Sequence, residues 1–447
     1  MDTSKESVRE SLRVQLWPVP LIAVIIALVL GQALPYLDRQ LDDSMPPVVS
    51  GILFGGGPEA ARSLLETIAS STITVTSLTF SLTVVTLQLA SSQFSPRLLR
   101  TFTRDRFVHN TLALFLATFV FALTVLRSIR VETSAGPAFV PEIAVTTAFA
   151  LTISSVVGLV LFLAYLARQI RVETMLRDVH RETDKTLERV FPEHDSRRPS
   201  VRTPEGRPDA VRAPSSGFLT RIDTGALLSA AERLDAFVSV DVAPGASLVA
   251  GVPVARVWDA QAVPLDGDRL AELTETVSRS LRTDFERTST QDPSFGLQQL
   301  LDVTDKALSP GVNDPTTAVH ALSHISAILC SLTDRTTGPV TLYDSNDRAR
   351  LNLTLPSFAQ LLDLVMDQLI TYAFTDPRTA GRSIAMLSEI TISASRAGTL
   401  PTHTSALSGH QARVRTAVEA STLDAVIRAD LASQLNDVER QHRRPGA

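Results

Sequence analysis

The sequence predicts a mainly α membrane protein, in which four transmembrane helices precede a cytosolic α+β region with a small β-rich module and a helical domain. Three observations predict this fold class. Four apolar runs in the N-terminal part of the chain are each long enough to cross a bilayer of about 30 Å. Arginine clusters follow the second and fourth runs, whereas an acidic segment follows the first. The rest of the chain has a mixed composition, so the 447 residues together are 44% hydrophobic.

The four predicted spans are about 17–37, 66–93, 107–126 and 141–167. They form a transmembrane domain, 17–167, behind a cytosolic N-terminal segment, 1–16. Trp17 and Tyr36 lie at the two ends of the first span, where amphipathic rings prefer the headgroup level. The loop that follows, 38–63, is acidic. Because basic residues stay on the inner side, we expect a multi-pass protein of the bacterial inner membrane with both termini in the cytoplasm.

The second span differs from the others because Ser, Thr and Gln fill about half of it. At helical spacing these residues form two rows. The first row consists of Thr72, Thr76, Thr79, Thr83 and Thr86. The second row consists of Ser70, Thr74, Ser77, Ser81 and Gln88. A helix that faces lipid all round would not carry both rows, so at least one row is expected to face protein or water.

Two interpretations of these rows remain open. In one, both rows serve helix packing, since small hydroxyl residues let helices approach closely and can bond to backbone carbonyls. In the other, one row packs and the other lines a polar pathway. All ten residues are therefore candidates for lining a pore.

The predicted cytosolic part begins as a helical extension of the fourth span, 168–191, with a heptad-like apolar seam. We expect this seam to pack either on its copies in an oligomer or against its own chain. A linker rich in Pro, Arg and Ser, 192–215, precedes the β-rich module, 216–263. The last domain, 264–447, is predicted to be mainly helical, with one β-hairpin near 338–354.

The β-rich module contains the pattern PGASLVAGVPVARV, which resembles half of a barrel-sandwich hybrid, the fold of biotinyl and lipoyl domains. No lysine stands at the turn that would carry such a cofactor. The resemblance therefore implies the fold alone, and no cofactor is expected.

A second candidate site lies in the stretch 295–318, FGLQQLLDVTDKALSPGVNDPTTA. A helix at about 294–308 is expected to turn sharply into a second helix that Asp314 caps. The candidate ligand or interface residues are Asp302, Asp305, Lys306, Ser309, Asn313, Asp314 and Thr316. One interpretation is a well-capped corner with an ion pair between Asp302 and Lys306, spaced i,i+4. The other is a site for a ligand, an ion or a second subunit.

The sequence contains no recognisable nucleophile motif or phosphate-binding glycine loop, so no catalytic residue is assigned and no enzyme is expected. His320 and His324 have a spacing that suits zinc, but no further ligand is recognisable, so no metal site is assigned. The single cysteine, Cys330, excludes an internal disulfide. A net charge of −5 argues against nucleic acid as a partner.

Two strings carry a resemblance to a known family. The string LASSQFSPRLL, at 89–99, and the string at 295–318 resemble a bacterial family of predicted integral membrane proteins labelled only as a domain of unknown function. The similarity covers about 10–440. It implies a multi-span N-terminal region and a cytosolic C-terminal region, and it implies no activity or functional residue.

The sequence thus predicts a homo-oligomeric, channel-like pore for ions in a lipid bilayer, with the second span lining the path and a cytosolic regulatory domain. A passive pore is favoured over a proton-coupled carrier, because carriers generally need an ionisable residue within the membrane. The alternative is a membrane-anchored sensor or scaffold whose cytosolic domain binds a ligand or a protein partner.

Overall fold

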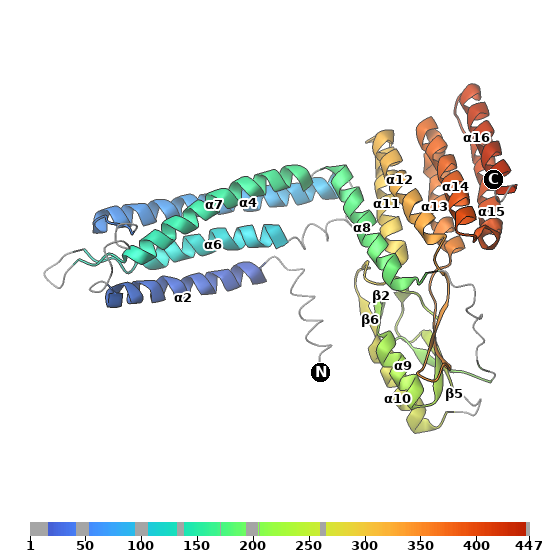
Figure 1. Cartoon of the computed structure of the whole chain (residues 1–447), viewed down its shortest axis with the longest axis horizontal. Helices are drawn as coiled ribbons and strands as arrows, with labels where there is room; N and C mark the ends of the chain where they lie inside the picture. The colour runs from blue at the N-terminus through green and yellow to red at the C-terminus, as the bar shows by residue number, and fades with distance from the viewer. Residues whose placement is uncertain are drawn as a thin grey trace. The chain divides into compact units, whose positions relative to one another are not determined.

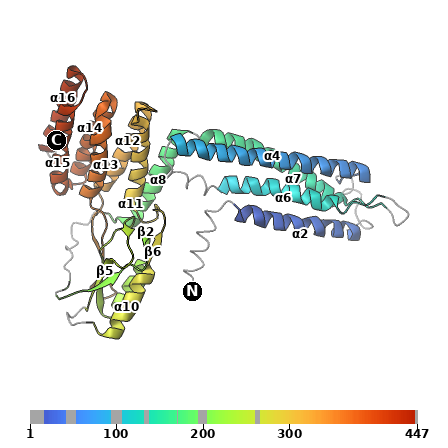
Figure 2. The same ribbon diagram turned by 180° about the vertical axis from the view of Figure 1, so that it is seen from behind.

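The computed structural model describes residues 17–41, 53–93, 106–131, 138–169, 171–193, 204, 206–259 and 265–443. The chain divides into two compact units, Met1–Arg171 and Val172–Ala447. Figures 1 and 2 show their elements from opposite sides. Each unit has its own core, and each is described by itself below.

The first unit is a bundle of four helices, and each is long and apolar enough to cross a membrane, as predicted. Its helices are α2 (Pro18–Leu41), α4 (Pro58–Gln93), α6 (Arg106–Leu126) and α7 (Glu142–Gln169). The helices run side by side, and α2, α4 and α7 all pack on α6 (Figure 1). This arrangement leaves one side of α4 without a neighbour among the described residues.

The first two helices are longer than predicted, and the loop predicted at 38–63 is correspondingly too long. Helix α2 continues to Leu41, and α4 begins at Pro58. Hydropathy marks only the apolar part of a helix, whereas proline at a helix start and charged helix formers extend it further. Most of the apolar piece 48–54 of this loop lies outside the described residues.

Asp38 is buried near the end of α2 and fastens α2 to α7. Its carboxylate accepts hydrogen bonds from the backbone N–H groups of Ile143, at 3.0 Å, and Ala144, at 3.2 Å. These N–H groups belong to the first turn of α7 and have no partner inside the helix. Asp38 therefore caps α7 from a distant part of the chain.

Two apolar clusters fix how the helices of the bundle align. One joins Leu65 and Ala69 of α4 to Phe121 and Val125 of α6. The other brings Leu82 of α4 against a set on α6 and α7 consisting of Val108, Leu112, Phe162 and Leu166. Since α4 and α6 run antiparallel, the part of α4 around the first row lies level with the middle of α6.

The second unit contains two sheets. The five-stranded sheet has the order β1-β5-β3-β8-β7, and the three-stranded sheet has the order β4-β2-β6. Their strands are β1 (Asp209–Arg212), β2 (Gly217–Ile222), β3 (Ala236–Val240), β4 (Ser247–Leu248), β5 (Pro253–Asp259), β6 (Leu281–Asp284), β7 (Val340–Tyr343) and β8 (Ala349–Leu353). All pairs are antiparallel except β3 with β8. The predicted hairpin is thus present as β7 and β8, and it completes the larger sheet.

The barrel-sandwich fold expected for 216–263 is not confirmed. Its strands divide between the two sheets instead of closing on themselves: β3 and β5 join β1, β7 and β8, whereas β2 and β4 pair with β6. In addition, α9 (Thr224–Arg233) forms within the module, and Asp223 caps it by accepting a hydrogen bond from the N–H of Ala226. Together with α10 (Gly267–Ser280), this helix contributes to the core that the two sheets share.

The rest of the second unit is helical, as predicted for most of 264–447. Its helices are α8 (Val172–Val190), α11 (Pro293–Leu308), α12 (Pro315–Leu332), α13 (Phe358–Tyr372), α14 (Pro377–Arg396), α15 (Leu400–Ala420) and α16 (Ala425–Arg443), with a short 3-10 turn, η2 (Ala373–Thr375), after α13. Pro401 lies in the first turn of α15, where proline needs no N–H partner.

The predicted extension 168–191 is not one continuous helix with the fourth span. Helix α7 ends at Gln169 and α8 begins at Val172. The seam of α8 is buried against α11 and α12 of the same chain. The sequence left two partners open for this seam, its copies in an oligomer or its own chain. The structure shows that the seam packs against its own chain.

Candidate functional site

The first row of α4 faces the interior of the bundle. All five threonines are buried, and Thr79 is completely so. Thr76 donates its hydroxyl hydrogen to the carbonyl of Thr72 at 2.7 Å, and Thr83 donates to that of Thr79 at 2.8 Å. Thr86 donates in the same way to Leu82. Hydroxyls satisfied in this way serve helix packing, and no path for ions is needed to explain them.

The exception in the first row is Thr79, whose Oγ1 is buried without a hydrogen-bond partner in the described part of the chain. On the neighbouring helices, the hydroxyls of Thr118 and Ser155 bond each other at 3.0 Å inside the bundle. Polar side chains thus occur inside the bundle on α4, α6 and α7. Among the described residues of these helices, only the Thr79 hydroxyl is buried without a hydrogen-bond partner, which costs stability.

The second row of α4 faces outward. All five of its residues are exposed in the single chain. Thr74 donates to the carbonyl of Ser70 at 2.8 Å. The side chains of Ser77, Ser81 and Gln88 make no hydrogen bond to any described residue.

Apolar side chains flank this outward row on both sides. The exposed flanking residues are Ile73, Leu78, Phe80, Val84, Val85 and Leu89. The row also extends toward the start of α4 through Ser63 and Thr67, which keep the same 4-3 spacing and are also exposed. A single chain therefore presents a stripe of small polar residues from Ser63 to Ser81 between two apolar borders, and Val84 separates this stripe from Gln88.

The α11–α12 corner has the predicted capping. The carboxylate of Asp314 accepts hydrogen bonds from the N–H of Thr317, at 3.1 Å, and from its hydroxyl, at 2.6 Å. These bonds, the hydroxyl bond first, lower the pKa of Asp314. Asn313 takes a left-handed conformation, with φ of +49°, which asparagine tolerates better than most residues. The turn is therefore held by its own cap.

The expected ion pair between Asp302 and Lys306 does not form. Oδ1 of Asp302 accepts a hydrogen bond from Nε2 of Gln298 at 3.0 Å. Lys306 is exposed, and its side chain makes no ion pair with a described residue. Ser309 and Thr316 lie at the turn: Ser309 donates to the carbonyl of Lys306, and Thr316 accepts from Arg378 at 3.5 Å. Of the seven predicted residues, Ser309, Asn313, Asp314 and Thr316 thus lie at the turn. Asp302 and Asp305 lie on the face of α11 toward α13, and Lys306 is exposed.

On that face, Asp305 is the group that can change charge near neutral pH. Its Oδ2 accepts a hydrogen bond from Nε2 of Gln368 on α13, whereas its Oδ1 is buried without a partner among the described residues. The pKa of Asp305 is raised to about 6, chiefly by burial; the hydrogen bond from Gln368 opposes the shift and the neighbouring carboxylate of Asp302 contributes to it. Sequence reasoning missed Gln368, because no local pattern links α13 to α11.

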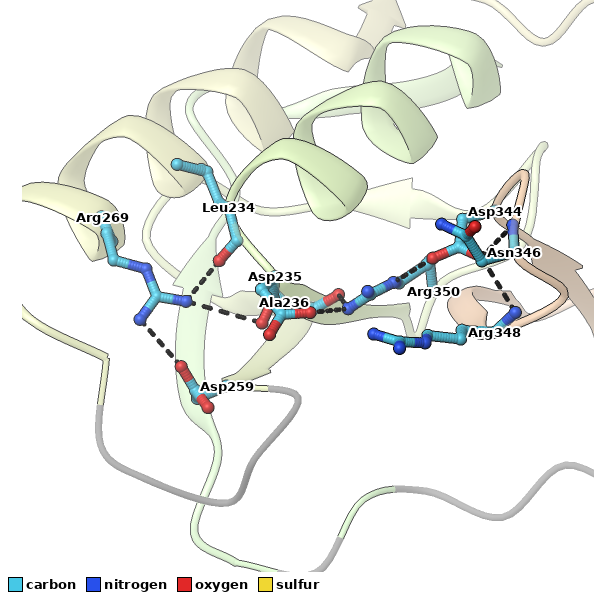
Figure 3. Close-up of polar contacts among 9 residues, drawn as sticks. All are labelled: Leu234, Asp235, Ala236, Asp259, Arg269, Asp344, Asn346, Arg348 and Arg350. Atoms are coloured by element: carbon cyan, nitrogen blue, oxygen red, sulfur yellow. Dashed lines mark hydrogen bonds and ion pairs between the residues drawn. The ribbon is translucent and has the colours of Figure 1, made fainter.

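A network of arginines and carboxylates in the five-stranded sheet was also missed (Figure 3). Arg350 is 4% exposed; its Nε binds Asp344 at 2.8 Å and its Nη1 binds Asp235 at 2.7 Å. Arg269 of α10 binds Asp259 at 2.8 Å. These pairs tie the β7–β8 hairpin and α10 to the ends of β3 and β5, so the network holds the sheet together and offers no open ligand position.

Comparisons with known proteins agree with this architecture. The family model described as "Predicted membrane protein (DUF2254)" matches residues 13–389. The uncharacterized protein Rv1290c of Mycobacterium tuberculosis and the uncharacterized protein Mb1321c of Mycobacterium bovis are each 34% identical over 396 residues, which cover 86% of this chain and 73% of the relative. No solved structure matches the chain.

Proposed function

The chain belongs to the DUF2254 family of predicted membrane proteins, and on that premise we propose that it is a homo-oligomeric, channel-like pore. The pore lies in the bacterial cell membrane with both termini in the cytoplasm, and the second unit regulates it. Helix α4 of each copy lines the path with its second row. The first row is not part of the path, because it is packed inside each bundle.

The observation that supports the pore is the outward orientation of the second row. Hydroxyl and amide groups facing acyl chains would lack hydrogen-bond partners, which is costly in a bilayer. Copies of α4 arranged around an axis would give Ser77 and Ser81 access to water. The apolar borders, such as Phe80 and Val85, would then pack between neighbouring copies and against lipid. The stripe of polar residues would thus contact water in an assembly, whereas in a single chain it would face lipid.

The chemistry of the row sets the expected selectivity. Ser and Thr oxygens present dipoles but no charge, so such a path would favour cations weakly. Glu66, exposed one turn before Ser70, adds a carboxylate near one end of the row, but Arg62 pairs with it at 3.6 Å and reduces its effect. A small preference for cations over anions is therefore expected.

The alternative function is a membrane-anchored sensor or scaffold. Asp305 favours it, because a buried carboxyl with a pKa of about 6 changes charge in the physiological range. In that reading the second unit binds a ligand or partner, and the four helices serve as an anchor.

Planar-bilayer recording with the purified chain tests the pore. We expect the wild-type protein to conduct, and Ser77→Leu and Ser81→Leu each to reduce the conductance at least about tenfold by replacing polar groups in the path. Val160→Leu is the matched control, because it adds bulk to an exposed apolar residue of α7, away from both rows and borders of α4, and should leave the conductance unchanged. A wild-type protein that stays silent under voltage, tension and changes of pH would overturn the pore, as would a normal conductance in both serine variants.

A further inference from the structure

Two histidines face each other between α8 and α12. Nδ1 of His180 lies 3.0 Å from Nδ1 of His324. The two rings meet edge to face, with centroids 5.0 Å apart and planes at 70°. The side chain of His180 is 23% exposed, so the pair lies at the margin of the core, where small ions can reach it.

Each helix contributes a second metal-ligating side chain one turn away. On α8, Asp184 follows His180 by four residues, and its Oδ2 lies 3.0 Å from Nε2 of His180. On α12, His320 precedes His324 by four residues, is exposed, and makes no hydrogen bond to a described residue. Residues four apart on a helix lie on the same face, so His320 stands beside the pair.

These positions have the chemistry of a metal site. A carboxylate on one ring nitrogen of histidine fixes the ring and leaves the other nitrogen free to bind a metal. Two nitrogens 3.0 Å apart can both reach one ion at about 2.0–2.1 Å, the usual zinc–histidine distance. Two histidines spaced i,i+4 on a helix can bind one zinc ion together.

We propose that His180, His324 and His320 bind a divalent transition-metal ion of the zinc class, with Asp184 as the positioning residue of His180. Nδ1 of His180 and Nδ1 of His324 are the prearranged ligands, and His320 is the third. In the metal-free chain one ring donates its Nδ1 hydrogen to the other. When the ion binds, the ring that donated the hydrogen changes tautomer and carries its hydrogen on Nε2. Both Nδ1 atoms then have a lone pair available for the ion.

The third ligand requires a movement. Among the described residues, no three His, Cys, Asp or Glu side chains already surround one point. The imidazole of His320 must therefore turn toward the pair, which its exposure allows. Arg382 on α14 donates a hydrogen bond to Ser323, next to His324 in the sequence, but it is paired with Glu389 at 2.8 Å, so its charge is balanced.

The consequence of binding would be a firmer attachment of α8. Helix α8 begins at Val172, shortly after α7 ends at Gln169, so it is the first element of the second unit along the chain. A metal ion held by both helices would cross-link α8 to α12. This inference is independent of the proposed pore, since it concerns only contacts within the second unit.

Zinc titration of the full, untagged chain in detergent, after treatment with a chelator, tests the site. Isothermal titration calorimetry should show one zinc ion per chain, and bound Co²⁺ should give the visible absorption of a histidine-ligated ion. Asp184→Asn should weaken zinc binding about 10–100-fold, as loss of a carboxylate behind a histidine ligand does. His180→Gln, His320→Gln and His324→Gln should weaken it further, and His410→Gln, a histidine paired with Asp363 outside the site, should not change it.

Thermal unfolding gives a second readout that does not depend on how well the ligand variants fold. Zinc should raise the Tm of the wild-type chain, and the exposed substitution Asp184→Asn should reduce that rise. Absence of zinc binding by the wild-type chain would overturn the site and leave an ordinary hydrogen bond between two histidines. Unchanged binding in His180→Gln and His324→Gln would show an adventitious ion and overturn it equally.

Discussion

Thr183 on α8 lies directly against the backbone of Gly296 on α11. A Cβ atom placed on Gly296 would be 1.8 Å from Oγ1 of Thr183 and 2.9 Å from its Cβ. Thr183 cannot move aside, because it is buried and its hydroxyl donates to the carbonyl of Val179 at 2.7 Å. Gly296, the second residue of the string 295–318 that carries part of the family resemblance, is therefore a point of close helix approach.

Gly296→Ala should destabilise the second unit. The added methyl group must push α8 away from α11, and overpacking of this kind typically costs about 1–3 kcal/mol. The measurement is the thermal unfolding of the purified chain. In a Thr183→Gly background the same substitution should cost much less, because the colliding side chain is gone. An equal loss of Tm in both backgrounds would show that the two residues are not in contact.

Asp305 should make the second unit less stable as the pH rises through its pKa. Its folded pKa, about 6, is above the usual value, so the folded chain holds this proton more tightly than the unfolded chain. Stability is then highest below about pH 4 and declines up to about pH 6. Asp305→Asn should remove this decline and stabilise the chain at pH 7 by about 1 kcal/mol, after allowance for solvent screening. Unfolding in urea at several pH values measures both effects.

Asp302→Asn is the companion variant for this titration. Removing the neighbouring negative charge should lower the pKa of Asp305 and shift the decline in stability to lower pH, without abolishing it. If Asp305→Asn and wild type show parallel pH profiles, Asp305 does not titrate in this range.

The parts of the fold that could be predicted from the sequence are those that depend on residues close together in the chain. The spans follow from apolar length, and the cap at Asp314 follows from residues within three positions of it. The missed features join distant residues: Gln368 meets Asp305 across 63 positions, and β3 pairs with β8 in parallel. The helix α9 was not predicted within the β-rich module, because a short apolar pattern fits a strand or a helix.

The two rows of α4 illustrate the same limit within one helix. Their spacing showed that they occupy different faces, but only the packing of α6 and α7 decides which face is internal. A test of the pore with Thr79→Leu or Thr83→Leu, which the sequence alone would suggest, would therefore disturb the core of the bundle instead.

Thr79→Val should stabilise the membrane unit. Valine has nearly the same shape as threonine, and it removes a hydroxyl that is buried without a partner. Losing that desolvation cost should yield about 1 kcal/mol. Thr83→Val is the matched control: its hydroxyl is satisfied by the carbonyl of Thr79, so its removal should bring no gain. Unfolding of the detergent-solubilised chain by increasing SDS gives the comparison.

Cysteines in the two rows should distinguish between them in the membrane. Ser77→Cys, in the outward row, should cross-link between copies with a short bifunctional thiol reagent and give a dimer band. Thr76→Cys is the matched control, since it is one residue away but faces the interior. The native Cys330 should contribute little, because burial raises the pKa of its thiol to about 11 and leaves almost no thiolate at pH 8.

The cross-linking result separates assembly from conduction, because it requires only that α4 helices of different copies approach each other. Cross-links at Ser77 together with a silent bilayer recording would mean that the second row packs α4 against α4, as small residues commonly do in membranes. Equal cross-linking at Thr76 and Ser77 would contradict the inward orientation of the first row. Absence of cross-linking at both positions would mean that the second row faces lipid or another protein. Helices α4 of different copies would then not surround a path, and the proposed pore would be overturned.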